Sequence, residues 1–193
     1  RLNTGGDALT HQQLRNCTIR LLDPKFNDFI IELSREENFK NCIATISYDQ
    51  LLSAYDQELV LRFFAFKNWR SRFKHDVSDF LTEYLEAVSD PEVPEDFSYE
   101  LEAQAFKKTF LILSKTLSDR AFSRANKSRN DLIKGFGIYH YEAFTVGLQA
   151  YLDKINPESD DEIAQLKDLF TNIKYDLQFI DLTTGGGKNS PGP

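Results

Sequence analysis

Two glycines precede an expected helix start at the beginning of the chain. Asn3-Thr4-Gly5-Gly6 leads into Thr10 and Gln13, whose spacing predicts a capping box and a helix running to about Leu22. Glycines let a ligand approach the backbone closely, and the N–H groups of a helix N-terminus carry partial positive charge. The combination suits an anion such as a phosphate group.

Polar side chains crowd the first turns of this helix. Gln12 and Gln13 are both neighbours of Asn16 on the helix surface, and Arg15 offers a planar fork of donors for a phosphate or a carboxylate. The alternative is structural: a glycine turn, a capping glutamine and a solvated arginine. Residue types and spacing alone favour this alternative, because no Gly-Lys-Ser/Thr follows and the loop is therefore not a Walker loop.

Two basic segments could contact nucleic acid. The first interleaves cations with Trp69 and Phe73, which would allow phosphate contacts and base stacking, and the second lies in an irregular stretch. The cations are Lys67, Arg70, Arg72 and Lys74 in the first segment, and Arg120, Arg124, Lys127, Arg129 and Lys134 in the second. The alternative is a solvated connection between helices, paired with local acids. It is favoured for the first segment, and both interpretations stay open for the second.

No other group of residues has the spacing of a catalytic or metal site. The three histidines are scattered and the cysteines lack metal-ligand spacing, so neither a zinc site nor a catalytic triad is expected. His140, at an expected helix start beside Tyr141 and Glu142, is interpreted as structural.

Helical periodicity dominates the chain and predicts an all-α fold, an irregular bundle of about six or seven helices. Helices are expected over residues 10–22, from Asp23-Pro24, and over 47–66, 76–88, 99–118, 140–155 and 160–177. The stretch 120–137 is expected to be irregular, with a short strand or turn. We expect one helical domain over residues 1–178 and a Gly/Pro-rich tail over 179–193.

Composition narrows the class of protein. Hydrophobic residues make up 41% of the 193 residues and include 16 Phe and 8 Tyr, so an aromatic core is expected. A net charge of -7 argues against nucleic-acid binding over the whole surface but allows a local basic face. Two cysteines predict no disulfide framework and favour the cytoplasm, and no apolar run suggests a membrane span. Because the chain lacks Met and begins at Arg1, we expect a fragment of a larger protein.

Four stretches of the chain are similar to motifs of one protein family. They are Arg1–Gly6 continued by Leu9-Thr10 and Gln12–Asn16, then Gln57–Ala65, Val77–Tyr84 and Thr184–Ser190. In this order they resemble the motif RLNTGG-x-x-L-x-x-QELRN, an ELVLRFLA helix, a FLNEYM stretch and a glycine-rich segment of the GmrSD-type family of anti-phage restriction proteins. One departure is Gln13, where that family often has Glu.

The resemblance implies a bacterial defence protein that couples nucleotide hydrolysis to cleavage of foreign or modified phage DNA. Its catalytic Asp-Gly-Gln-Gln-Arg motif lies in an upstream ParB/sulfiredoxin-like domain, which is missing here, as is a downstream nuclease domain or subunit. A nucleotide triphosphate, Mg²⁺ and DNA are the implied cofactors and partners. The chain would supply one wall of the nucleotide pocket, formed by Arg1, Asn3, Thr4, Gly5, Gly6, Gln13, Arg15 and Asn16. The competing hypothesis is a non-catalytic protein-interaction or scaffold module.

Overall fold

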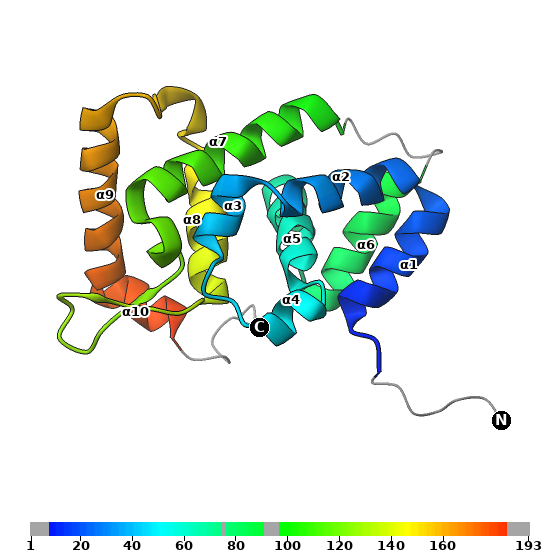
Figure 1. Ribbon diagram of the computed structural model, residues 1–193, viewed down its shortest axis with the longest axis horizontal. Coiled ribbons are helices and arrows are strands. Elements are labelled where there is room, and N and C mark those ends of the chain that lie inside the picture. Colours follow the sequence, from blue (N-terminus) through cyan, green and yellow to red (C-terminus); the bar gives the residue numbers. More distant parts are fainter. Residues whose placement is uncertain (1–7, 75, 91–96, 185–193) are drawn as a thin grey trace.

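A computed structural model describes residues 8–74, 76–90 and 97–184, and over these residues the chain is an irregular all-α bundle (Figure 1). The helices are α1 (His11–Leu22), α2 (Pro24–Ser34), α3 (Glu37–Cys42), α4 (Tyr48–Leu52), α5 (Tyr55–Trp69), α6 (Val77–Ser89), α7 (Tyr99–Leu117), α8 (Ile138–Gln149), α9 (Asp160–Tyr175) and α10 (Leu177–Thr183). The predicted fold class is confirmed, with more helices than expected. No helix of the described part is long and apolar enough to cross a bilayer.

Short 3-10 segments and one hairpin connect the helices. They are η1 (Arg70–Arg72), η2 (Ser118–Arg120), η3 (Leu152–Lys154) and the antiparallel strands β1 (Arg124–Ala125) and β2 (Leu132–Ile133), in which Arg124 lies opposite Ile133. The hairpin occupies the stretch that was expected to be irregular.

Local capping fixes the first two helix starts as predicted. Thr10 Oγ1 accepts a hydrogen bond from the Gln13 N–H, and Gln13 Oε1 accepts one from the Thr10 N–H at 2.9 Å. Asp23 Oδ1 accepts from the N–H groups of Lys25 and Phe26, with Pro24 at the first helical position. Both caps use residues within three positions, so the sequence alone is enough to predict them.

The single helix predicted over residues 47–66 is wrong, because the chain breaks between α4 and α5. Ala54 has a left-handed φ of 59° there. The carbonyl oxygens that end α4 are capped by the start of α1: Thr10 Oγ1 donates to Ser53 O, and the Gln13 side-chain amide donates to Leu52 O. A contact between distant segments therefore stabilises the break.

Helix α5 runs through the centre of the bundle and packs against α2, α6 and α8 (Figure 1). It buries Leu59, Val60, Leu61, Phe63, Phe64 and Ala65. Phe106 and Phe110 of α7 lie 4.5 Å apart between ring centroids, and Phe63 meets Phe106 edge-on at 5.2 Å. The expected aromatic core is confirmed.

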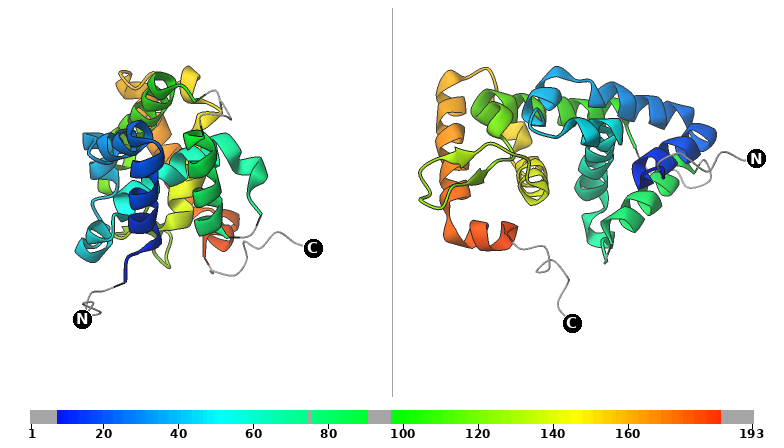
Figure 2. Two further views of the ribbon diagram at one scale, coloured as in Figure 1. Left: turned by 90° about the vertical axis from the view of Figure 1, so that its right-hand side faces the viewer. Right: turned by 60° about the horizontal axis from the view of Figure 1, so that its bottom comes forward.

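The last helices form one end of the molecule. Helix α9 packs against α7 and the hairpin, and α10 turns away from the end of α9 (Figures 1 and 2). Phe179 of α10 meets His140 and Phe144 of α8 edge-on. Because α10 continues to Thr183, it crosses the boundary expected at residues 178 and 179. Residues 185–193 of the predicted tail lie outside the described residues.

Candidate functional site

Helix α1 turns a polar face toward the bundle and leaves leucines exposed. Gln12, Arg15 and Ile19 are buried, whereas Leu14 and Leu21 are 49% and 87% exposed. The guanidinium of Arg15 explains this orientation, because the acceptors for its N–H groups lie on α5 and α6, on the buried side of α1.

All five N–H groups of Arg15 are used inside the protein. Its Nε donates to Thr82 Oγ1 at 3.1 Å. One terminal nitrogen donates to Gln12 Oε1 at 3.0 Å and to Glu58 Oε2 at 3.2 Å, and the other donates to the carbonyl and hydroxyl oxygens of Ser78. Burial lowers the pKa of Arg15, and the charge of Glu58 opposes that shift. The arginine joins three helices and has no N–H left for a phosphate.

The neighbouring predicted residues are also engaged by protein groups. The Gln13 amide binds Thr10 and Leu52, as described above. Asn16 accepts from the Gln12 amide at 2.8 Å and donates to Gln57 Oε1 at 2.7 Å. The polar motif of α1 is thus brought together, but around helix α5. The other predicted pocket residues lie outside the described residues; they are Arg1, Asn3, Thr4, Gly5 and Gly6.

The first basic segment lies at the end of α5 and in η1, where acids accompany it. Lys67 forms an ion pair with Glu102 at 2.8 Å, and the Arg72 guanidinium stacks over the Trp69 ring at 3.9 Å. Arg70 is exposed. The surface hollow beside this segment is lined by Arg72 and Lys74 together with Glu83, Glu86 and Asp90. These acids make the segment a poor site for phosphate.

The second basic segment is carried by the β1–β2 hairpin and is less neutralised. Arg120 pairs with Asp131 at 2.8 Å. Arg124, Lys127 and Arg129 are exposed, and none of them has an ion pair with a described residue. The stretch 124–134 holds four basic residues and one acidic residue, a net charge of +3 in a chain whose net charge is -7.

A hollow of about 370 Å³ lies at the base of this hairpin, and we call it the hairpin hollow. Its lining residues are Arg124, Ile133, Lys134, Gly135, Phe136, Gly137, His140, Thr183 and Thr184. None of them is acidic. Lys134 reaches Asp119 only at 3.9 Å, with its side chain 74% exposed. The hollow therefore presents two cations to solvent without an acid in its wall.

Helix α8 begins in the wall of the hairpin hollow. Its N-cap is Gly137, which has no side chain to cap the first N–H groups of the helix. The Gly137 N–H itself donates to Phe122 O at 2.9 Å. A Cβ at this position would stand 3.1 Å from His140 Cδ2 and 3.2 Å from Phe122 O, so glycine lets His140 and the preceding turn pack closely.

His140 is buried, and a buried lysine lies behind it. Lys174, fully buried in the last turn of α9, donates to Ala121 O at 2.8 Å and Ser123 O at 2.9 Å, and contacts His140 Nδ1 at 3.4 Å. Its ammonium also lies 4.4 Å from the centre of the Phe144 ring. Burial lowers the pKa of Lys174 to about 7. Burial, together with the charges of Lys174 and Arg124, lowers the pKa of His140 to about 3.

No pattern in the sequence indicated this buried pair. Lys174 stands where a cation commonly faces solvent at a helix C-terminus. The structural interpretation of His140 is consistent with its hydrogen bond to Lys174. Its Nε2, however, has no hydrogen-bond partner among the described residues, and the ring lines the hairpin hollow.

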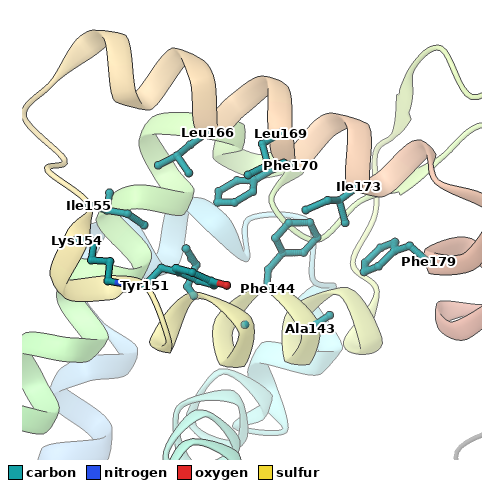
Figure 3. Close-up of a pocket in the computed structure, with 12 residues that line it drawn as sticks. Ala143, Phe144, Tyr151, Lys154, Ile155, Leu166, Leu169, Phe170, Ile173 and Phe179 are labelled. Carbon is teal, nitrogen blue, oxygen red and sulfur yellow. The ribbon is translucent and has the colours of Figure 1, made fainter.

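An apolar groove of about 420 Å³ separates α8 from α9. Leu166, Phe170 and Ile173 project from α9 toward Phe144 of α8, and Lys154 lies at one end (Figure 3). No sequence pattern singled out this groove, because its residues come from separate helices and have the spacing of ordinary core positions.

The described residues contain no group of His, Cys, Asp and Glu side chains that could hold a metal ion. Of the residues that the resemblance places at the nucleotide, Gln13, Arg15 and Asn16 lie in the described part, and protein groups engage their side chains. Comparison with protein-family models, with curated proteins and with solved structures finds no match to this chain.

Proposed function

We propose that this chain is the DNA-contacting helical portion of a bacterial cytoplasmic defence protein, acting on foreign or modified phage DNA. The resemblance of its motifs to the GmrSD-type family motivates the class of protein. The single observation that carries the DNA contact is the cationic hairpin. Arg124, Lys127 and Arg129 project into solvent without ion-pair partners in the described part.

Phosphate contacts explain why such a patch would persist on an acidic chain. Each cation that neutralises a DNA phosphate releases a condensed counterion, so a small patch can bind DNA even when the rest of the surface is negative. The whole chain carries -7 and residues 124–134 carry +3, so the remaining residues carry -10, which would restrict DNA to this face. The resemblance assigns the metal- and nucleotide-dependent steps to an upstream domain, so the proposal for this chain concerns the DNA contact alone.

Duplex DNA binding measured over a series of salt concentrations tests the proposal. Affinity should fall steeply with salt, and Lys127→Ala and Arg129→Ala should each reduce the slope of log K against log[salt] by about 1. Arg20→Ala is the matched control: Arg20 is exposed on α1, at the far end of the molecule from the hairpin (Figure 1), and its loss should leave the slope unchanged. Undetectable binding at low salt, or equal slopes for all variants, would refute the proposal.

A protein-interaction module is the second candidate, and the apolar groove between α8 and α9 favours it. Partly exposed Leu169 in its wall could be covered by an apolar partner. Leu169→Lys separates the two functions, since it would weaken a protein contact and leave DNA binding unchanged. A chain that binds no DNA at low salt would give this second function priority.

A further inference from the structure

The hairpin hollow differs from two other polar hollows of the described part in the signs of its charges. The hollow beside Arg15 is lined by Asp79 and Glu86, and the one beside Trp69 by three acids. The hairpin hollow has Arg124 and Lys134 and no acid. An anion would therefore meet attraction in the hairpin hollow and repulsion from nearby carboxylates in the other two.

The hydrogen bonds of Lys174 determine which nitrogen of His140 carries the proton. Below its pKa of about 7, Lys174 is a charged ammonium with three N–H donors and no acceptor, so in that state the contact at 3.4 Å requires Nδ1 of His140 to accept. Neutral His140 must then carry its proton on Nε2. Since Nε2 has no partner among the described residues and the ring lines the hollow, this N–H is a donor without an acceptor.

The uncapped start of α8 adds a third kind of donor. Gly137 gives the first turn no side-chain cap, and Gly135, Phe136 and Gly137 all line the hollow. The hydroxyl groups of Thr183 and Thr184 are less available, because they donate to Phe179 O and Ile180 O. The donors left for a ligand are two flexible cations, one fixed imidazole N–H and the positive end of a twelve-residue helix.

We propose that the hairpin hollow binds a phosphate monoester, the group found on a DNA 5′ end or a mononucleotide. This inference rests on the proposed DNA contact and deepens it by assigning a terminal phosphate to one site. A phosphate monoester carries a charge of about -1.5 to -2 at pH 7, which two cations and neutral donors can balance. A backbone phosphate diester carries only one negative charge, and the exposed cations along the hairpin can bind it equally well outside the hollow.

Lys174 acts in this site as a positioning residue. It lies behind His140, buried from solvent, and its hydrogen bond orients the imidazole. Without the ammonium, His140 could place its proton on either nitrogen, and a lone pair on Nε2 would face the phosphate. The effect of Lys174 on binding therefore operates through the tautomer of His140.

Two measurements on the full chain test the site. First, ¹⁵N NMR of the histidine side chains, at a pH between the pKa values of His140 and Lys174, should show His140 neutral and protonated on Nε2, with its resonances shifting on addition of inorganic phosphate. Second, a single strand with a 5′-phosphate should bind about tenfold more tightly than the same strand with a 5′-hydroxyl, the size of one charge-assisted hydrogen bond. A nucleoside 5′-monophosphate competing equally well would identify the free nucleotide as the source of the phosphate.

Variants separate the site from the rest of the hairpin. Lys134→Ala is a surface change that should remove the 5′-phosphate preference, whereas Lys127→Ala should keep it. Lys174→Met should leave His140 in a mixture of both tautomers and weaken the preference with it; if it fails to fold, Lys134→Ala still decides. No phosphate-dependent shift of His140, or equal binding of the two strand ends, overturns the inference. If the phosphate site fails but salt-dependent duplex binding persists, the proposed function still stands. If duplex binding is absent but phosphate still shifts the His140 resonances, only the proposed function is overturned.

Discussion

Replacing Arg15 by Met distinguishes a structural anchor from a ligand-binding arginine. Methionine keeps an apolar stem of similar length but removes the charge and all five donors. Gln12 Oε1 and one lone pair of Ser78 O would then lose their donor on the buried side of α1. The Glu58 carboxylate would lose its hydrogen bond from Arg15 as well. The Arg15 side chain is 4% exposed, so water cannot easily replace its hydrogen bonds.

The expected loss of stability follows from these contacts. Removing one partner of a buried ion pair costs about 3–5 kcal/mol. The lower end applies here, because Glu58 is 19% exposed and keeps Arg62 at 3.3 Å. A loss of about 3 kcal/mol would lower the melting temperature by about 6–12 °C for a chain of this size.

Urea unfolding followed by the fluorescence of Trp69, the single tryptophan, measures this change. Arg20→Met on the same helix is the control, and because Arg20 is exposed it should stay within about 0.5 kcal/mol of the parent. Arg15→Lys should fall between the two, since an ammonium keeps the charge but cannot supply five donors in a plane. If Arg15→Met is as stable as the parent, Arg15 is no anchor, and a role in binding a ligand becomes the better explanation.

Two further predictions concern the buried pair and the start of α8. Burial lowers the pKa of Lys174 to about 7 from its ordinary 10.5, so between these pH values the unfolded chain binds more protons and stability should rise with pH, by up to about 1.4 kcal/mol per unit. Lys174→Met should remove this rise, and parallel stability curves for parent and variant would contradict it. Gly137→Ala should weaken phosphate binding while the chain stays folded by circular dichroism, because its Cβ would press on His140 and Phe122 O. Gly147→Ala in α8 is the control, because an added Cβ there has no atom within 4 Å, and this variant should bind phosphate normally. Equal phosphate binding by the two variants would show that the close packing at Gly137 is irrelevant.

The helix starts were predictable because their causes are local. Thr10 with Gln13, and Asp23 with Pro24, satisfy N–H groups within three residues, so their effect does not depend on the rest of the fold. Helix α7 was likewise expected over nearly its whole length, because Phe106, Phe110 and Leu113 keep helical spacing.

The break at Ala54 and the orientation of α1 could not be predicted in this way. The break depends on two hydrogen bonds between distant parts of the chain. Thr10 donates to Ser53 O, 43 positions along the chain, and Gln13 donates to Leu52 O, 39 positions along the chain. The inward face of α1 depends on Glu58, Ser78 and Thr82 lying around Arg15. A hydrophobic pattern ranks an arginine below a leucine for burial, and only a set of acceptors fixed in space reverses that order.

The sequence by itself therefore determined the helical class, the aromatic core and the basic character of the 120–134 stretch, because composition and short-range spacing are enough for each. Tertiary structure alone decided which polar residues became anchors and which stayed available. It closed Arg15 into the bundle, placed Lys174 behind His140, and left Arg124 and Lys134 around an acid-free hollow. The physical reason is that a charged side chain is buried only where distant segments supply its partners, and those partners meet only when the chain is folded.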